Sequence, residues 1–334
     1  MNIKEFYIVA NTRNEFKNES VLSMRPYNDH PSYESIEFVT NQLIEVGFNT
    51  KFFGGIEKLI EAYHQKKTFP NSLFLNFSDG MNQASRKAQS AILLELLGVP
   101  YAGSDPLARL IAGNKRYAKK IVAGKLQTPK GFIIFDNNIF PLKLNFPVIV
   151  KPNREGSSIG ITQQNICKNK EELQYRISEL LYSFDEILIE EYIQGYEITC
   201  FVIGNKQHYY LNEPIICEYD GSYYFENFIF GIEEKASRKR KEYLAKEFLP
   251  SYQIQYIQQA SQIAFEMLGM HDFARIDFRL NKNGILYFIE VNGNAVISET
   301  SEIGIISKSL EVPFGTIVGN IINSAMERLH LNRD

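Results

Sequence analysis

The stretch ARIDFRLNKNGILYFIEVN, residues 274–292, decides the fold of this chain. Two segments of alternating apolar residues, 274–280 and 287–291, flank the pair Asn283-Gly284. An Asn-Gly pair between apolar runs is typical of a two-residue type I′ turn, so the stretch predicts a β-hairpin. On one face of the hairpin this turn places apolar residues opposite one another: Ile276 and Val291, Phe278 and Ile289, Leu280 and Tyr287.

The other face of the predicted hairpin carries charge. Asp277 lies opposite Glu290, and Arg275 lies opposite Asn292. Like charges directly across a ladder are destabilising, because their Cβ atoms are only about 4.5–5.5 Å apart. A hard divalent cation between two carboxylates and an amide oxygen removes that repulsion, since such cations prefer oxygen ligands. The alternative interpretation is an ion pair of Asp277 with Arg275 or Arg279 on an exposed face.

The size and composition of the chain narrow its class. A length of 334 residues predicts two or three domains. The net charge of −3 gives no basic footprint, so we expect no nucleic-acid partner. Three cysteines, far apart and odd in number, are typical of a reducing compartment. Without a signal-peptide pattern or a run of about 18 apolar residues, the sequence predicts a cytoplasmic protein with no membrane segment.

Hydrophobic periodicity divides the chain into three predicted units. In the first, strands at residues 6–10 and 73–77 alternate with helices at 35–46 and 84–97, which predicts a parallel sheet as far as about residue 103. The second contains helices at 112–125 and 170–182, the segment 131–135, and strands at 146–150 and 159–162, and a strand at 186–191 leads into the third unit. The third contains the segment 197–203, the hairpin, and helices at 252–268 and 314–329. The basic run 235–241 is interpreted as a solvated face or a mobile loop.

A lysine and a glycine/serine loop follow the apolar run 146–150. Lys151 ends this predicted buried strand, and REGSSIG, residues 154–160, comes next. Glycines and small hydroxyl residues let backbone N–H groups approach an anion closely, so the loop suits a polyphosphate. It is neither a Walker A loop nor a dinucleotide-binding G-x-G-x-x-G, and a plain turn explains it equally well. Further on, Glu190 and Glu191 are either an exposed strand end or partners for a base and a ribose.

Four blocks in this order resemble the ATP-grasp superfamily, and specifically the D-alanine–D-alanine ligases. They are ELLGVPYAGSDP (95–106), FPVIVKPNREGSSIGIT (146–162), LIEEYIQGYEIT (188–199) and the hairpin stretch. The resemblance implies an α/β (α+β) ATP-grasp fold with three domains. Residues 1–104 would form an N-terminal parallel α/β pre-ATP-grasp domain. Residues 105–190 and 191–334 would form two α+β lobes that sandwich ATP, the first carrying the glycine/serine loop and the second the metal site.

The resemblance also implies roles for single residues. Lys115 and Lys151 match the lysines on the ATP phosphates, and Ser157 and Ser158 match the loop beside them. Glu190, Tyr192 and Ile193 match the adenine-binding linker, and Glu197 matches the ribose-binding acid. Asp277, Glu290 and Asn292 match the ligands of Mg²⁺, or of Mn²⁺ in its place. Arg275 matches the arginine that stabilises the developing oxyanion, and it acts in catalysis together with Lys151 and Ser157.

The chain departs from the family pattern around the amino-acid substrates. Residues 11–30 lack the Gly-Gly-x-Ser-x-Glu loop, and NFSDGM (76–81) replaces His-Gly-x-x-Gly-Glu-Asp-Gly. Ala295-Val296 replaces a Pro-Gly pair, and the phosphate-binding lysine expected at 224–229 has only Lys235, Arg238 or Lys239 as substitutes. Arg86 is either a helix-surface charge or a substrate contact, and Ser301 is either a polar loop residue or a substrate contact. These departures predict intact ATP and Mg²⁺ sites with rebuilt substrate pockets.

The implied activity is an ATP-dependent carboxylate–amine ligase. It would join two amino acids, or an amino acid and a peptide, through an acyl phosphate and release ADP and phosphate. The partners implied are these small-molecule substrates and a second copy of the chain, because related ligases commonly form dimers through the first domain. The alternatives are an ATP-grasp small-molecule kinase and a nucleotide-binding regulatory protein without catalysis.

Overall fold

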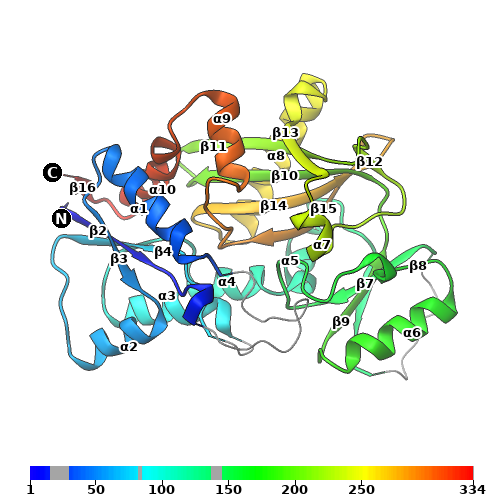
Figure 1. The fold of residues 1–334 in the computed structure, drawn as a ribbon, viewed down its shortest axis with the longest axis horizontal. Coiled ribbons are helices and arrows are strands. Elements are labelled where there is room, and N and C mark those ends of the chain that lie inside the picture. Colours follow the sequence, from blue (N-terminus) through cyan, green and yellow to red (C-terminus); the bar gives the residue numbers. More distant parts are fainter. Residues whose placement is uncertain (16–29, 82–84, 137–144, 334) are drawn as a thin grey trace.

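The computed structural model describes residues 1–15, 30–81, 85–136 and 145–333. In this part of the chain, three larger sheets follow one another in sequence, and a two-stranded sheet joins the ends of the chain (Figure 1). Most of the polar stretch 11–30 and the first residue of the predicted helix 84–97 lie outside the described residues. Short 3-10 turns occur at Arg13–Glu15, Gln163–Asn165 and Ala245–Glu247.

The N-terminal sheet is parallel, as the alternation of strands and helices predicted. Its order is β3 (Thr50–Gly54), β2 (Glu5–Val9), β4 (Ser72–Asn76) and β5 (Tyr101–Ala102). One face packs against α2 (Ile56–His64) and α3 (Arg86–Leu96). The other packs against α1 (Tyr33–Glu45) and the C-terminal helix α10 (Phe314–Arg328). The last helix of the chain therefore completes the core of the first predicted unit.

The central sheet is antiparallel and has the order β6 (Gly131–Ile134), β9 (Ile187–Glu191), β7 (Val148–Pro152) and β8 (Ile166–Cys167). Helix α6 (Lys170–Leu181) buries Leu173, Ile177 and Leu180 against it. The predicted strand 159–162 is wrong. This segment turns at Gly160, whose φ is 75°, and the fourth strand forms later, at β8.

The predicted helix 112–125 is also wrong in its extent, because two helices meet here. α4 (Pro106–Ala112) ends at Gly113, and α5 (Lys115–Val122) begins after Asn114. The Asn114 side chain accepts a hydrogen bond from the amide of Tyr117 at 3.1 Å, which caps the second helix. Lys115 consequently stands in the first turn of α5.

The C-terminal sheet is antiparallel and runs β13 (Arg240–Leu244), β11 (Tyr209–Tyr219), β10 (Gly195–Gly204), β14 (Asp272–Leu280) and β15 (Leu286–Asn292), with β12 (Tyr224–Phe225) on β10. Helix α8 (Ser251–Met267) packs on it through Ile257, Ala264 and Phe265. The basic run 235–241 starts in α7 (Ile232–Ala236) and ends in β13, an edge strand. Arg238, Lys239 and Lys241 are exposed, as a solvated face predicts.

β14 and β15 form the predicted hairpin, but the predicted two-residue turn is wrong. Residues 281–285 separate the strands, and the amide of Gly284 donates to the carbonyl of Asn281. Near this loop Phe278 pairs with Phe288, one residue away from its predicted partner. A β-bulge after Asp277 takes up the extra residue. The bulge restores the predicted register at Asp277–Glu290 and Arg275–Asn292, so the charged pairs are confirmed.

A buried carboxylate joins the C-terminal sheet to the N-terminal one. Asp272, 0% exposed at the start of β14, accepts hydrogen bonds from Arg328 Nη2 at 2.6 Å and from the amide of Gly103 at 2.9 Å. Arg328 also donates to the carbonyl of Tyr101 at 3.0 Å. The strand, the last helix and the end of the first sheet are thereby held together.

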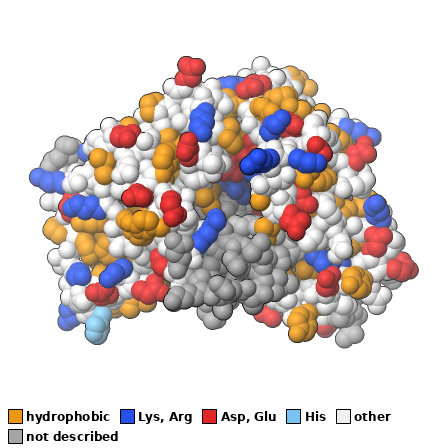
Figure 2. Space-filling model, in the orientation of Figure 1, with side chains coloured by type: hydrophobic (Ala, Val, Ile, Leu, Met, Phe, Trp, Pro, Cys, Tyr) orange, Lys and Arg blue, Asp and Glu red, His pale blue; other side chains and the backbone are white. Residues whose placement is uncertain are grey.

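The two termini lie side by side in Figure 1, where β1 (Asn2–Ile3) pairs in parallel with β16 (Asn332–Arg333). Charged side chains of both signs are interspersed over the face drawn in Figure 2, so no extended area of one sign dominates it.

Among the described helices, none is by itself long and apolar enough to cross a membrane. Only α9 (Glu302–Leu310) and α10 reach that length and hydropathy together, as a pair bent by 117°.

We expect Asp272→Ala to lower the free energy of unfolding by about 3–5 kcal/mol, because it leaves the Arg328 guanidinium without its buried counter-ion. Urea denaturation measures this change. The control is Lys308→Ala, since the ion pair of Lys308 with Glu299 is exposed and contributes at most about 1 kcal/mol. Equal losses in the two variants would contradict the assignment.

Candidate active site

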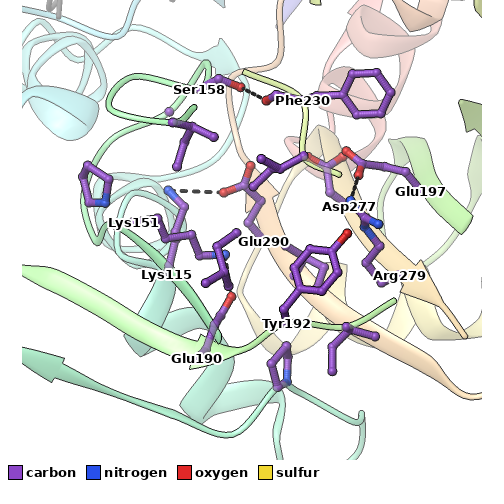
Figure 3. Close-up of a pocket in the computed structure, with 18 of the residues that line it drawn as sticks. Lys115, Lys151, Ser158, Glu190, Tyr192, Glu197, Phe230, Asp277, Arg279 and Glu290 are labelled. Carbon is purple, nitrogen blue, oxygen red and sulfur yellow. Dashed lines mark hydrogen bonds and ion pairs between the residues drawn. The ribbon is translucent and has the colours of Figure 1, made fainter. Parts of the chain in front are cut away.

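A pocket lies between the central sheet and the β14–β15 hairpin (Figure 3). Lysines and a glutamate from α5, β7 and β9 stand on one side, and acidic side chains of β10, β14 and β15 face them. Most of the predicted ATP and metal residues line it, namely Lys115, Lys151, Ser158, Glu190, Tyr192, Ile193, Glu197, Asp277 and Glu290. The tertiary structure therefore brings together residues from three separate sequence blocks.

The glycine/serine loop has an unusual backbone at its two serines. Ser157 and Ser158 both have positive φ, 51° and 58°, which non-glycine residues rarely adopt. Successive residues of this kind are strained and concentrate at functional sites. The Ser158 hydroxyl donates to the carbonyl of Phe230 at 2.7 Å, and the Gln163 amide donates to the carbonyl of Ile229 at 2.6 Å. These bonds tie the loop segment to the segment before α7, across the outer side of the pocket.

Glu190 is held between two buried ammonium groups. Its oxygens lie 2.5 Å from Lys151 Nζ and 2.6 Å from Lys119 Nζ. Burial raises the pKa of Glu190, but the two lysines outweigh it and hold that pKa below its ordinary value. Burial lowers the pKa of Lys119 to about 7, although Glu190 raises it in part. Sequence reasoning missed Lys119, even though its spacing of four residues from Lys115 on one helix was a signal.

Glu197 and Tyr192 share one partner, Arg279. From the sequence, Arg279 was considered only as a partner of Asp277. Arg279 Nη2 lies 2.6 Å from Glu197 Oε2, and its guanidinium lies 5.6 Å from the Tyr192 ring centroid. The amide of Tyr192 donates to the carbonyl of Pro147 at 3.1 Å, so it is already used within the protein. The predicted adenine contact through Glu190, Tyr192 and Ile193 stays a prediction, and it would have to use groups other than this amide.

The charged face of the hairpin carries a network of ion pairs. Arg275 grips Asp277 with two hydrogen bonds, at 3.0 and 2.9 Å, and its third nitrogen lies 3.2 Å from Glu302 Oε1. Lys115 Nζ lies 3.2 Å from Glu290 Oε2. The alternative interpretation of the sequence is therefore right about Arg275, but the pair is largely buried rather than exposed.

The two opposed carboxylates are electrostatically unequal. Burial raises the pKa of Asp277, Arg275 lowers it in part, and the charge of Glu290 raises it further. Burial also raises the pKa of Glu290, but Lys115, Lys151 and Lys235 outweigh it and hold that pKa well below its ordinary value. Thr199, opposite Asp277 on β10, donates to Asp277 Oδ1 at 3.1 Å and helps to fix its position.

The donor set of this face fits a hard divalent cation that shares its shell with phosphate. Asp277, Glu290 and Asn292 offer only oxygen ligands on this side, and Mg²⁺ is usually bound by one or two carboxylates plus substrate phosphates. Among the described residues, no group of three or more His, Cys, Asp or Glu side chains is arranged so that it could hold a metal ion. The pocket is lined by six carboxylates but only four cationic side chains. A polyphosphate would be repelled there without metal charge.

Of the three candidates for the missing phosphate-binding cation, Lys235 lines the pocket. Lys239 is exposed and pairs with Asp220 at 2.7 Å, and Arg238 is exposed. The short helix α7 provides Lys235, which the sequence placed in a loop.

A second pocket adjoins the first and shares Lys115, Glu155, Gly156 and Glu290 with it. It also contains the predicted residues Ser157, Arg275 and Asn292. Its remaining wall consists of charged and polar groups that sequence reasoning missed: Asp79, Lys87, Arg109 and Asn294. Their signal was the charged helix start Arg86-Lys87, where the family pattern has an acid.

The two predicted substrate residues lie apart from this wall. Arg86 is buried, lines a neighbouring groove and lies 3.8 Å from Glu155, so it is not a helix-surface charge. The Ser301 hydroxyl donates to the carbonyl of Ser298 at 2.7 Å, at the start of α9, and it lines none of the three described pockets.

Comparison with known proteins agrees with this geometry. The family model described as "D-ala D-ala ligase C-terminus" matches residues 137–323. The D-alanine–D-alanine ligase of Aquifex aeolicus is 31% identical over 234 residues, which are 69% of this chain and 75% of that protein. The corresponding ligase of Thermotoga petrophila is 28% identical over 298 residues, covering 88% of this chain and 92% of its own.

Solved structures share the fold. The D-alanine–D-alanine ligase of Bacillus anthracis, complexed with ATP, superposes with a TM-score of 0.71 at 20% identity, covering 97% of this chain and 98% of its own. The VanG D-Ala:D-Ser ligase of Enterococcus faecalis gives a TM-score of 0.69 at 17% identity, covering 97% and 100%.

Three sheets in this order, with a lysine-lined pocket between the second and the third, define the ATP-grasp fold. The chain belongs to the D-alanine–D-alanine ligase family of that fold. It is an ATP-dependent carboxylate–amine ligase, and neither a kinase nor a non-catalytic nucleotide binder is favoured.

We expect Lys119→Met to flatten part of the pH dependence of stability. Because the folded-state pKa of Lys119 is about 7, below its ordinary 10.5, the unfolded chain binds the proton more tightly. The contribution of Lys119 to the free energy of unfolding therefore increases as the pH rises from about 7 to 10.5. Relative to wild type, the variant should lose at least about 1 kcal/mol between pH 7 and pH 10 in urea denaturation. Lys120→Met, on the exposed side of α5, is the control. A pH-independent difference would refute the expectation.

We expect Lys235→Ala to weaken ATP binding by about 10- to 100-fold, the usual effect of losing a hydrogen bond to a charged group. Lys239→Ala should change it by less than about twofold, since that residue lies outside the pocket. Isothermal titration calorimetry with Mg·ATP measures both. Equal affinities in the two variants would show that Lys235 does not contact the nucleotide.

Proposed function

We propose that the chain joins two amino acids, or an amino acid and a peptide, by activating one carboxylate as an acyl phosphate. The observation that carries this proposal is the pair Asp277–Glu290, which faces Lys115 and Lys151 across one pocket. A platform of oxygen ligands opposite fixed ammonium groups suits a metal-bound triphosphate. The relatives are named D-alanine–D-alanine ligases, and for this chain we propose amino acids in general as the class of substrate.

Each wall of the pocket has a distinct task in this proposal. Lys115, Lys151 and Lys235 hold the phosphates, and the left-handed backbone at Ser157 and Ser158 turns amide groups toward them. Glu190, Ile193 and Glu197 bind the base and the ribose. Because these lysines lie on α5, β7 and α7, the phosphates would be bound by side chains of three different elements.

Asp277, Glu290 and Asn292 would hold Mg²⁺ or Mn²⁺. When bound, the metal neutralises charge on the phosphates during transfer. Their ion pairs with Arg275 and Lys115 would orient Asp277 and Glu290, and Lys115 also helps to hold the pKa of Glu290 below its ordinary value. Both carboxylates would therefore be positioned before the cation arrives.

Arg275 would stabilise the oxyanion formed when the amine attacks the acyl phosphate. It lines the second pocket, and its two carboxylate partners, Asp277 and Glu302, fix the plane of its guanidinium. Donors that are oriented in advance are worth more than mobile ones, because they need no reorganisation during the reaction. The hydrogen bonds of Ser158 and Gln163 hold the loop segment against the segment before α7, and this contact would help to exclude water from the acyl phosphate.

We also propose that the protein works in the cytoplasm. All three cysteines are free and buried, which fits a reducing compartment.

The test is phosphate release from Mg·ATP in a screen of paired D- and L-amino acids and dipeptides. A ligase releases phosphate only when a carboxylic acid and an amine are both present, whereas a kinase transfers phosphate to a single substrate. Mass spectrometry of the product distinguishes an amide from a phosphorylated acid. Nucleotide consumption with one substrate alone, yielding a stable phosphorylated product, would refute the ligase.

We expect Glu290→Gln to reduce turnover by about 10²-fold or more, since it removes one of two ionised ligands and half of the platform charge. ATP hydrolysis should also require more Mg²⁺ for half-maximal rate. Glu299→Gln, at an exposed position on the loop before α9, is the control. Wild-type dependence on Mg²⁺ in Glu290→Gln would remove Glu290 from the metal site.

A further inference from the structure

The second pocket contrasts in charge with the first. Five cationic side chains line it against three carboxylates, whereas the nucleotide pocket has an excess of carboxylates. The cations at the shared end, Lys115 and Arg275, are already paired with Glu290 and Asp277. The remaining positive charge is concentrated on the wall formed by the first sheet's loop, α3 and α4.

This wall is a network centred on Asp79, which is 2% exposed. Asp79 Oδ2 pairs with Lys87, and Oδ1 lies 3.3 Å from Arg109 Nη2. Asn294 Nδ2, from the segment after the hairpin, donates to the same Oδ1 at 3.0 Å. One carboxylate thus organises two cations and an amide, and the cluster keeps one net positive charge.

Two buried polar atoms of this network have no hydrogen-bond partner among the described residues: Arg109 Nη1 and Asn294 Oδ1. Arg109 is 2% exposed, and its other nitrogens donate to the carbonyls of Lys87 and Ser78. The bond of Asn294 Nδ2 to Asp79 fixes the amide orientation, so Oδ1 cannot exchange places with it. An unpaired buried donor or acceptor is unfavourable, and such groups in a pocket point to a ligand.

The two unpaired atoms need different hydrogen-bond partners, because Arg109 Nη1 is a donor and Asn294 Oδ1 is an acceptor. A guanidinium N–H beside an ammonium group favours an oxyanion, whereas an amide oxygen favours an N–H donor. Arg109 Nη2 and Asn294 Nδ2 approach the same oxygen of Asp79, so the two side chains converge on one part of the pocket wall. A carboxylate with an amine on the adjacent carbon meets both requirements.

We propose that Lys87, Arg109 and Asn294 form the subsite for the α-carboxylate of the amine-bearing substrate, with Asn294 positioning its amine. This rests on the proposed function, because the carboxylate being activated must lie at the phosphate end, beside Lys115 and Glu290. The anion on this wall is then the other carboxylate. Ser301, the contact expected from the sequence, is tied to Ser298 outside the pocket, so a different residue has to take that task.

The backbone around the subsite supports a fixed position for Lys87. A Cβ atom at Gly113 would lie 3.1 Å from Lys87 Cγ, so the break between α4 and α5 leaves room for this side chain. Lys87 and Arg109 are specificity-determining residues in this scheme.

The test is calorimetric binding to the whole protein in the presence of Mg²⁺ and a non-hydrolysable ATP analogue. The probes are D-alanine, L-alanine, their homodipeptides, the carboxamide of each, and propionate. We expect at least one free acid to bind, its carboxamide to bind about tenfold or more weakly, and propionate to bind more weakly than alanine. In Lys87→Met the preference for acid over carboxamide should fall to within about threefold. Affinity for the ATP analogue should stay unchanged, which shows that this variant is folded.

Three results would overturn the subsite: no free acid binds, acid and carboxamide bind equally, or Lys87→Met weakens both equally. Lys120→Met is the matched control on an exposed site. Because binding is measured without turnover, acid-selective binding together with absent amide synthesis would refute the ligase but keep the subsite. Amide synthesis without acid selectivity would do the reverse.

Discussion

The structure depends on one electrostatic constraint: two carboxylates, Asp277 and Glu290, stand directly opposite each other on a hairpin. Such a pair opposes folding unless neighbouring charges compensate it. Arg275 compensates the charge of Asp277, and Lys115 compensates that of Glu290. Because Arg275 lies on β14 and Lys115 on α5, both elements contribute to the pocket. The repulsion that remains is what a divalent cation would relieve, so the same feature that strains the hairpin prepares the metal site.

The compensating charges also connect the lobes. Lys151 and Lys119 are bound to Glu190 on the central sheet, yet their charges, with that of Lys115, reach Glu290 on the C-terminal sheet. Three of the four cations that line the nucleotide pocket, Lys115, Lys151 and Arg279, therefore have an acid partner, and a metal ion would help to balance the charge of ATP there. The substrate pocket lacks that balance and keeps a positive wall at Lys87 and Arg109.

Hydrophobic periodicity predicted correctly those helices and strands whose bounds are set by their own residues. α1, β2, β4, α6, α8 and α10 were expected close to their bounds. Errors arose where side chains override periodicity. Asn114 and Gly113 divide one apolar stretch into α4 and α5, and a bulge in β15 shifts part of the hairpin register. Lys235 lies in α7, which begins after Gly231; the amide of Gly231 donates to the Glu234 side chain at 3.0 Å, a capping contact that the charge pattern of this run does not reveal.

The sequence by itself determined the family and the opposed acids of the hairpin, because these depend on ordered motifs and on spacing along single strands. Only the tertiary structure decided which groups meet across the lobes. It placed Lys119 on Glu190, Arg279 on Glu197 and Lys235 in the pocket. It also assembled Asp79, Arg109 and Asn294, which are separated by as many as 215 positions along the chain. Contacts over such distances arise from the packing of sheets and helices, which no local pattern records.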